Sequence, residues 1–233
     1  MDVPSTESQK RLLIALAEQL KLPLLQIARG AELVELGAPA HTDISRTADM
    51  ALQLIDSYIL SIMPAQTELA LEPVSIAAVL QDTAERLSDF AKQSDCDLEL
   101  SLSGKYGPVM ANRQSLEAAF AMLGYSFIEA ELATDEKRPR ILLAAHKSAH
   151  GLVAGIFGSQ AGLSSDMFRR ARALYGSARQ PLPSASMGSS AGLFIADSLL
   201  QSVATPLRLA RHHKLTGLAA TLLPSQQLEL HVS

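Results

Sequence analysis

Apolar residues recur at steps of three and four through the first 64 residues, which is the pattern of amphipathic helices. The first stretch ends at Gly37-Ala38-Pro39, a combination that stops helices. The second starts near Thr42 and ends at Pro64. The sequence therefore predicts a helical hairpin over residues 1–64. Its apolar stripe comprises Leu16, Leu20, Ile27, Ile44, Ala51 and Ile55.

A single hairpin cannot bury an apolar stripe on both of its helices. A four-helix bundle made from two copies would bury these residues. We therefore expect a homodimer.

The pattern changes after the hairpin. Residues 65–73 form a linker, and residues 74–233 mix helical and alternating stretches, which is typical of an α+β domain. Helices are expected at 75–90, 116–130, 165–175 and 191–203, and strands at 97–102, 109–111, 141–146, 152–157, 207–211, 215–223 and 228–232. Residues 176–188 are rich in Pro, Ser and Gly and predict a loop.

Composition narrows the class of protein. Hydrophobic residues make up 48% of the 233 residues and the net charge is −4, so a large core is expected and a surface that binds nucleic acid through bulk charge is not. Cys96 is the single cysteine, which excludes a disulfide framework. We find no apolar run long enough for a transmembrane helix and no secretory signal, so the expected location is the cytoplasm.

The segment from Glu18 to Leu24 reads E-Q-L-K-L-P-L. It resembles the phospho-acceptor box H-E-L-[RK]-x-P-L of two-component sensor histidine kinases. A proline inside a strongly periodic helix is unusual, because it removes a backbone hydrogen bond. The predicted order of elements also resembles this family, in which a dimerisation hairpin precedes an ATP-binding α/β sandwich. The resemblance extends over roughly residues 8–224.

The resemblance implies that the working residues of the family are replaced. Glu18 takes the place of the phosphorylated histidine. Ser126 takes the place of the asparagine that chelates magnesium, and a hydroxyl cannot supply an amide oxygen at the same reach. Gly158 takes the place of the aspartate that reads the adenine amino group. The glycine boxes are retained only in part, at Gly162 and at Gly188 and Gly192.

Because these positions are lost together, the resemblance implies a non-catalytic histidine-kinase-like protein with no cofactor. Its function would be protein–protein interaction. Besides the second copy, the expected partner is a response-regulator receiver domain or another signalling protein. The residues expected to dock that partner are Glu18, Lys21, Leu22, Leu25 and Arg29. The alternative is an atypical histidine phosphotransferase or kinase that uses a displaced histidine, for which His41 is a candidate.

Other motifs point elsewhere. Residues 188–192 read G-S-S-A-G, which matches the G-x-S-x-G nucleophile elbow, but the Pro-rich segment before it cannot be the central strand that this elbow requires. The remaining histidines, His146 and His212 among them, are expected in solvated turns. Arginines gather in the C-terminal half and predict either a solvated surface or an anion-binding one. They are Arg169, Arg170, Arg172, Arg179, Arg208 and Arg211.

Overall fold

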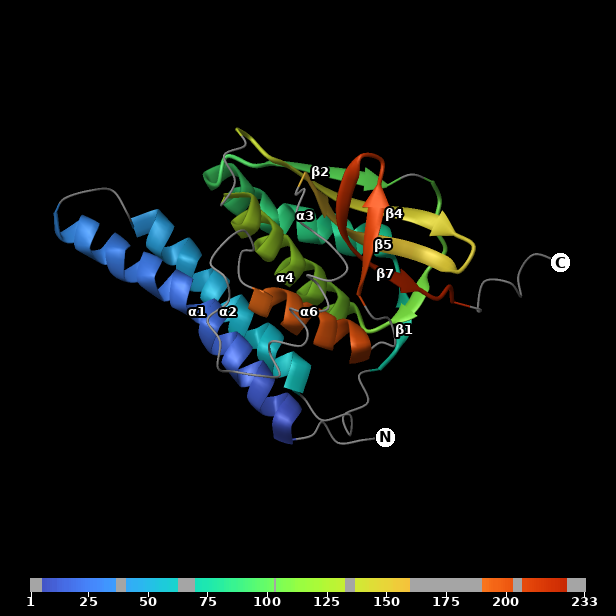
Figure 1. Ribbon diagram of the computed structural model, residues 1–233, viewed down its shortest axis with the longest axis horizontal. Helices are drawn as coiled ribbons and strands as arrows, with labels where there is room; N and C mark the ends of the chain where they lie inside the picture. Colours follow the sequence, from blue (N-terminus) through green and yellow to red (C-terminus); the bar gives the residue numbers. More distant parts are fainter. Residues whose placement is uncertain are drawn as a thin grey trace.

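Two long helices open the chain, α1 (Thr6–Glu35) and α2 (His41–Ile62), and they pack along each other. In the computed structural model they lie beside an α+β unit (Figure 1). The structure describes residues 6–36, 41–62, 70–102, 104–132, 137–159, 190–202 and 207–225. Gly30 of α1 allows the close approach of α2, because a Cβ there would lie 2.7 Å from Cγ1 of Ile44.

A five-stranded sheet forms the centre of the α+β unit. Its strands are β2 (Asp97–Leu102), β4 (Arg140–Ser148), β5 (Gly151–Gly158), β7 (Leu215–Leu222) and β6 (Arg208–His212), in that spatial order. β2 pairs with β4 in parallel, and all other neighbours are antiparallel. Two short strands, β1 (Glu72–Val74) and β3 (Val109–Ala111), form a separate antiparallel pair.

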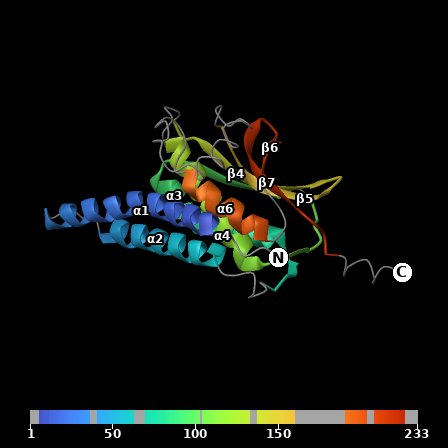
Figure 2. The same ribbon diagram turned by 60° about the horizontal axis from the view of Figure 1, so that its bottom comes forward.

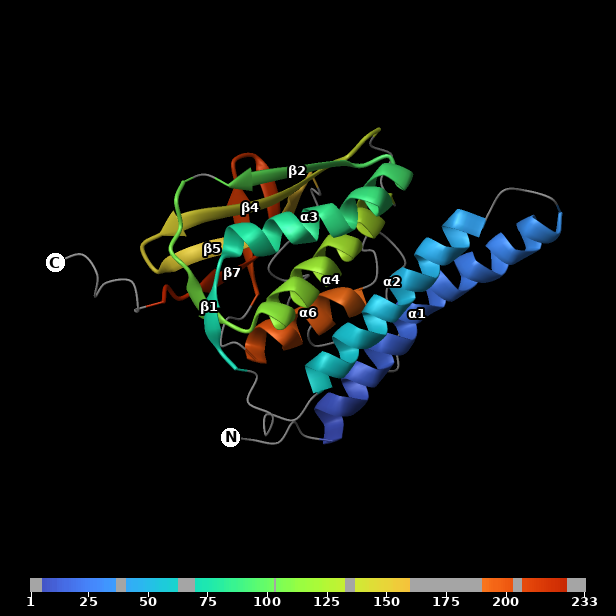
Figure 3. The same cartoon turned by 180° about the vertical axis from the view of Figure 1, so that it is seen from behind.

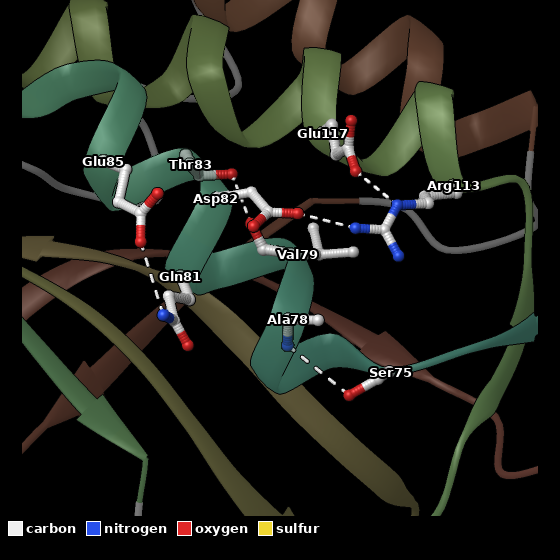
Figure 4. Close-up of polar contacts among 9 residues, drawn as sticks. All are labelled: Ser75, Ala78, Val79, Gln81, Asp82, Thr83, Glu85, Arg113 and Glu117. Atoms are coloured by element: carbon white, nitrogen blue, oxygen red, sulfur yellow. Dashed lines mark hydrogen bonds and ion pairs between the residues drawn. The ribbon is translucent and has the colours of Figure 1, made fainter.

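In the described part of the chain, one face of the sheet is covered by α3 (Ile76–Gln93), α4 (Arg113–Leu132) and α6 (Ser190–Ser202) (Figures 2 and 3). We refer to this sheet and these helices as the sandwich, and to α1 and α2 as the helical pair. The Ser75 hydroxyl caps α3 by accepting a hydrogen bond from the Ala78 N–H at 3.4 Å. Arg113 of α4 contacts Asp82 of α3 and Glu117 of its own helix, both at 2.6 Å (Figure 4). These contacts tie α3 to α4.

The core lies between the helices and the sheet, and it continues into the helical pair. Leu16 and Leu54 belong to the same buried cluster as residues of α4 and α6. α1 packs against α6, and α2 packs against both α4 and α6. The sandwich of the same chain therefore covers part of the stripe that we expected a second hairpin to cover, including Leu16. Ile27, Ile44 and Ile55 of that stripe are only half-buried.

Most predicted elements are found within one or two residues of their expected ends. α4 begins at Arg113, three residues before the predicted start, and β4 extends to Ser148. β1 was not predicted, because its three residues gain strand geometry only by pairing with β3. The predicted helix at 165–175, loop at 176–188 and strand at 228–232 lie outside the described residues. Within the described part of the chain, we find no helix that is both long and apolar enough to cross a membrane.

Candidate functional site at the junction of α4 and β5

Two of the predicted nucleotide positions, Ser126 and Gly158, lie on α4 and at the end of β5, and these two elements pack against each other. Residues 119–128 of α4 are all buried, since this helix lies between the sheet on one side and α2, α3 and α6 on the others. A helix enclosed in this way is apolar on every face. Any polar side chain on it therefore needs a specific explanation.

Ser126 is such a residue. Its side chain is 2% exposed, and among the described residues its Oγ has no hydrogen-bond partner. An oxygen so deep in the core is poorly placed to hold a hydrated metal ion, because Mg²⁺ keeps several of its waters. Nor do the described residues contain any cluster of three or more His, Cys, Asp or Glu side chains that could hold a metal.

Gly158 ends β5 and is buried. A Cβ at this position would lie 2.6 Å from Oε1 of Glu131 and 3.4 Å from Cδ1 of Phe127, and both of these residues come from α4. Glu131 is 1% exposed, and its Oε2 accepts a hydrogen bond from the Ser159 hydroxyl at 3.3 Å. The space that an aspartate side chain would need at position 158 is thus filled by a carboxylate from α4. The residues present do not fit the magnesium–nucleotide complex that the resemblance describes.

Of the three retained glycine-box residues, the structure describes only Gly192. Gly162 and Gly188 lie outside the described residues, whereas Gly192 is buried in the first turn of α6. Further along α6, Asp197 accepts hydrogen bonds from the Leu207 N–H at 3.2 Å and from the Gln201 side chain at 2.8 Å. This buried carboxylate holds the start of β6 against α6, so its role is structural.

The predicted docking residues follow α1. Glu18, Lys21 and Leu22 lie within this helix, with side chains outside the described part of the structure. Leu25 is 67% exposed and Arg29 is also exposed. α1 therefore presents an apolar and a basic side chain to solvent one turn apart.

A separate cavity of about 370 Å³ lies where α2 meets α3 and α4. Apolar residues such as Ile59 and Met122 line its base, and Asp56, Arg86 and Glu117 also line it. None of the described positions that the resemblance marks lines it. It shows that the helical pair and the sandwich are not completely packed together at this end.

The sequence did not single out Glu131, although a signal for it existed. Glu131 follows Phe127 by four residues and Leu123 by eight, which places it on the same face of α4 as these buried side chains. A carboxylate on the apolar face of a helix indicates a buried acidic group. What the sequence could not reveal is that Gly158 lies opposite it.

The prediction of solvated histidines is wrong for His212. Its ring is buried, with its centroid 5.3 Å from that of Phe157, 5.5 Å from His146 and 4.5 Å from His213. These contacts lie on the face of the sheet opposite the helices, in a second cluster that contains Phe157. Burial, and then the neighbouring His213 and His146, lower the pKa of His212 below its usual 6.5.

The comparisons with known proteins concern the fold. No model of a protein family matches the chain, and no curated protein matches it. Among solved structures, the chain is similar to the histidine kinase AdeS of Acinetobacter baumannii, with a TM-score of 0.54 and 12% identity, over 89% of this chain and 98% of AdeS. It is also similar to ShkA in complex with AMPPNP, with a TM-score of 0.52 and 14% identity, over 81% of this chain and 40% of ShkA.

The catalytic domain of the histidine kinase ThkA gives a TM-score of 0.50 at 8% identity, over 66% of this chain and 95% of that domain. Identities this low establish the fold alone. The chain therefore has the mixed α+β fold of histidine-kinase ATP-binding domains, and the resemblance predicted from the sequence is confirmed at this level.

Proposed function

We propose that this protein is a non-catalytic histidine-kinase-like protein that acts by protein–protein interaction in two-component-type signalling. The observation that carries the proposal is the Glu131 carboxylate, which lies 2.6 Å from the Cβ position of Gly158. Phosphoryl transfer depends on positioning and neutralising the nucleotide phosphates. A site with no magnesium-chelating amide at Ser126 and no aspartate at position 158 supplies neither the metal ligand nor base recognition.

The proposed partner is a receiver domain of a response regulator, which docks on α1. The exposed Leu25 and Arg29 support this surface, because an apolar anchor beside a guanidinium is a common combination at protein interfaces. Glu18 lies two helical turns before Leu25, so it would fall within the same interface.

The proposed assembly is a homodimer through the helical pair. Many large apolar side chains of α1 and α2 remain exposed in the single chain. Half-buried Ile44 lies against Gly30 at the contact between α1 and α2, and a second pair of helices would complete the burial of Ile44 and of half-buried Ile27.

Labelled ATP and a phosphorylated receiver domain test this function on the unmodified chain and on Glu18→His. Neither protein should be labelled by ATP, because the sandwich remains unchanged. Glu18→His should accept the phosphoryl group from the receiver's aspartyl phosphate onto the new imidazole nitrogen, since the receiver brings its own metal site. The unmodified chain should bind the receiver without becoming labelled.

Leu25→Asp should weaken receiver binding at least tenfold, whereas Leu36→Asp, at the far end of α1 and also exposed, should not. An ATP-dependent, acid-labile label on the unmodified chain would overturn the proposal. It would instead support a kinase or phosphotransferase with a displaced histidine.

A further inference from the structure

The carboxyl-terminal end of β5 and the last turn of α4 form an unusual pair. Gly158 has no side chain, and Glu131, the second-last residue of α4, lies directly over it. A negative charge near the C-terminal end of a helix is disfavoured by the helix dipole, and burial of a carboxylate is costly as well. A buried acid that is disfavoured on both counts is expected to have a specific role.

The contact is tight as well as buried. Real Cβ atoms essentially never approach another heavy atom to 2.6 Å, so a side chain at position 158 would force Glu131 to move. Cδ1 of Phe127 lies 3.4 Å from the same Cβ position, and the Ser159 hydroxyl donates a hydrogen bond to Glu131 Oε2. Because Glu131 is 1% exposed, it has no direct exit to solvent from its present position.

We propose that Glu131 closes the base-reading position of this fold, with its carboxylate seated in the space over Gly158, so that the two residues are mutually dependent. The inference rests on the proposed function and deepens it. A carboxylate anchored on a helix takes the place of one anchored on a strand, and it accepts a hydrogen bond from the Ser159 hydroxyl. Restoring an aspartate at position 158 alone then places two carboxylates in one buried space, where both cannot be ionised.

Four variants of the full chain test this dependence by thermal unfolding at pH 7. Gly158→Asp should lower the unfolding midpoint by on the order of 5 °C or more, because it adds both volume and like charge. Gly158→Asn has nearly the same volume without the charge and should be less destabilised. In the double variant Glu131→Ala with Gly158→Asp, the unfolding midpoint should return most of the way to that of the unmodified chain. Glu131→Ala alone should change the midpoint only slightly.

The pH dependence of the unfolding midpoint measures the part of the destabilisation that comes from charge repulsion. Lowering the pH from 7 to 5 should raise the midpoint of Gly158→Asp relative to that of Gly158→Asn, because protonation relieves the repulsion between the two carboxylates. If Gly158→Asp does not fold, a folded double variant would equally show that residues 131 and 158 depend on each other.

The proposal is overturned if Gly158→Asp is as stable as the unmodified chain, or if the effects of the two substitutions are simply additive. This failure is distinct from a failure of the proposed function. ATP-dependent labelling of the unmodified chain would contradict the function, whatever the four midpoints show. Additive midpoints would contradict the Glu131–Gly158 pair while the chain could still be inert toward ATP.

Discussion

The sandwich and the helical pair differ in how they bury their apolar side chains. In the sandwich, side chains such as Phe120, Leu87 and Leu143 are fully enclosed by α3, α4 and the sheet. In the helical pair, Leu16 and Leu54 are buried, but several large apolar side chains face solvent. They are Leu13, Leu24, Leu25 and Leu33 of α1, Leu36 directly after α1, and Leu52 and Ile59 of α2. These exposed apolar side chains support the interaction surface that we propose for the helical pair.

The difference indicates a division of roles. The sandwich contains most of the buried core, and we propose that Glu131 closes its nucleotide position. The helical pair packs against α4 and α6 of the sandwich, and we propose that its exposed side chains contact partners. Substitutions in the two regions should therefore affect different measurements.

The largest expected effect is on the sandwich core. Phe120→Ala removes a fully buried ring between α4 and its neighbours and should destabilise the protein by about 3–5 kcal/mol. Leu25→Ala, at a 67% exposed position of α1, should change the free energy of unfolding by less than about 0.5 kcal/mol. Urea unfolding of both variants measures the contrast. Equal losses would contradict the division between the two regions.

The next effect concerns association. Ile27→Asp places a charge at a half-buried position of α1 and should break the proposed dimer, since burial of an aliphatic side chain contributes roughly 1.5–3 kcal/mol. Gln26→Asp adds the same charge at the exposed neighbouring residue and should leave the dimer intact. Light scattering gives the mass of each protein. A monomeric unmodified chain would rule out the four-helix assembly.

A smaller effect is a pH dependence that originates in the sandwich. Since burial lowers the pKa of His212 in the folded state, the unfolded state binds the proton more tightly. The stability that comes from keeping His212 neutral is therefore fully present above pH 6.5. It is lost as the pH falls from 6.5 through the lowered pKa. His212→Phe should flatten the stability profile between pH 7 and pH 5, and His150→Gln, in an exposed turn, should not. An unchanged profile in His212→Phe would place the titration elsewhere.

The smallest effect is expected at the surface link between α3 and α4. Arg113→Leu removes contacts to Asp82 and Glu117, but these side chains are partly exposed and solvent weakens such ion pairs. The thermal midpoint should fall far less than it does in Phe120→Ala, and Arg113→Lys should retain part of the contact. A loss comparable to that of Phe120→Ala would show that this link, and not the core, holds α3 on α4.

Local signals in the sequence predicted much of the fold. The Ser75 cap and the periodicity after it predicted α3, and the apolar runs around the turn at 147–151 predicted the β4–β5 hairpin. These features depend on neighbouring residues alone. β1 depends on pairing with β3, some 35 residues further along the chain, and no local pattern could reveal it.

Less of the site could be predicted, because its contacts also join residues that are distant in the sequence. The resemblance identified Ser126 and Gly158 as altered positions, and both lie at the junction of α4 and β5. Glu131 comes close to Gly158 only when α4 is packed over the end of β5, so its position could not be read from the sequence. Likewise, His212 is buried only because β6 and β7 bring its ring against Phe157 and His146.

The central claim is that the sandwich has a nucleotide-binding fold without nucleotide binding. Calorimetric titration of the unmodified chain with ATP, with and without magnesium, tests this claim most directly. We expect only the heat of dilution in both titrations. A saturable heat with a Kd in the micromolar range would contradict the account, and dependence of that heat on magnesium would show that the metal site is also intact.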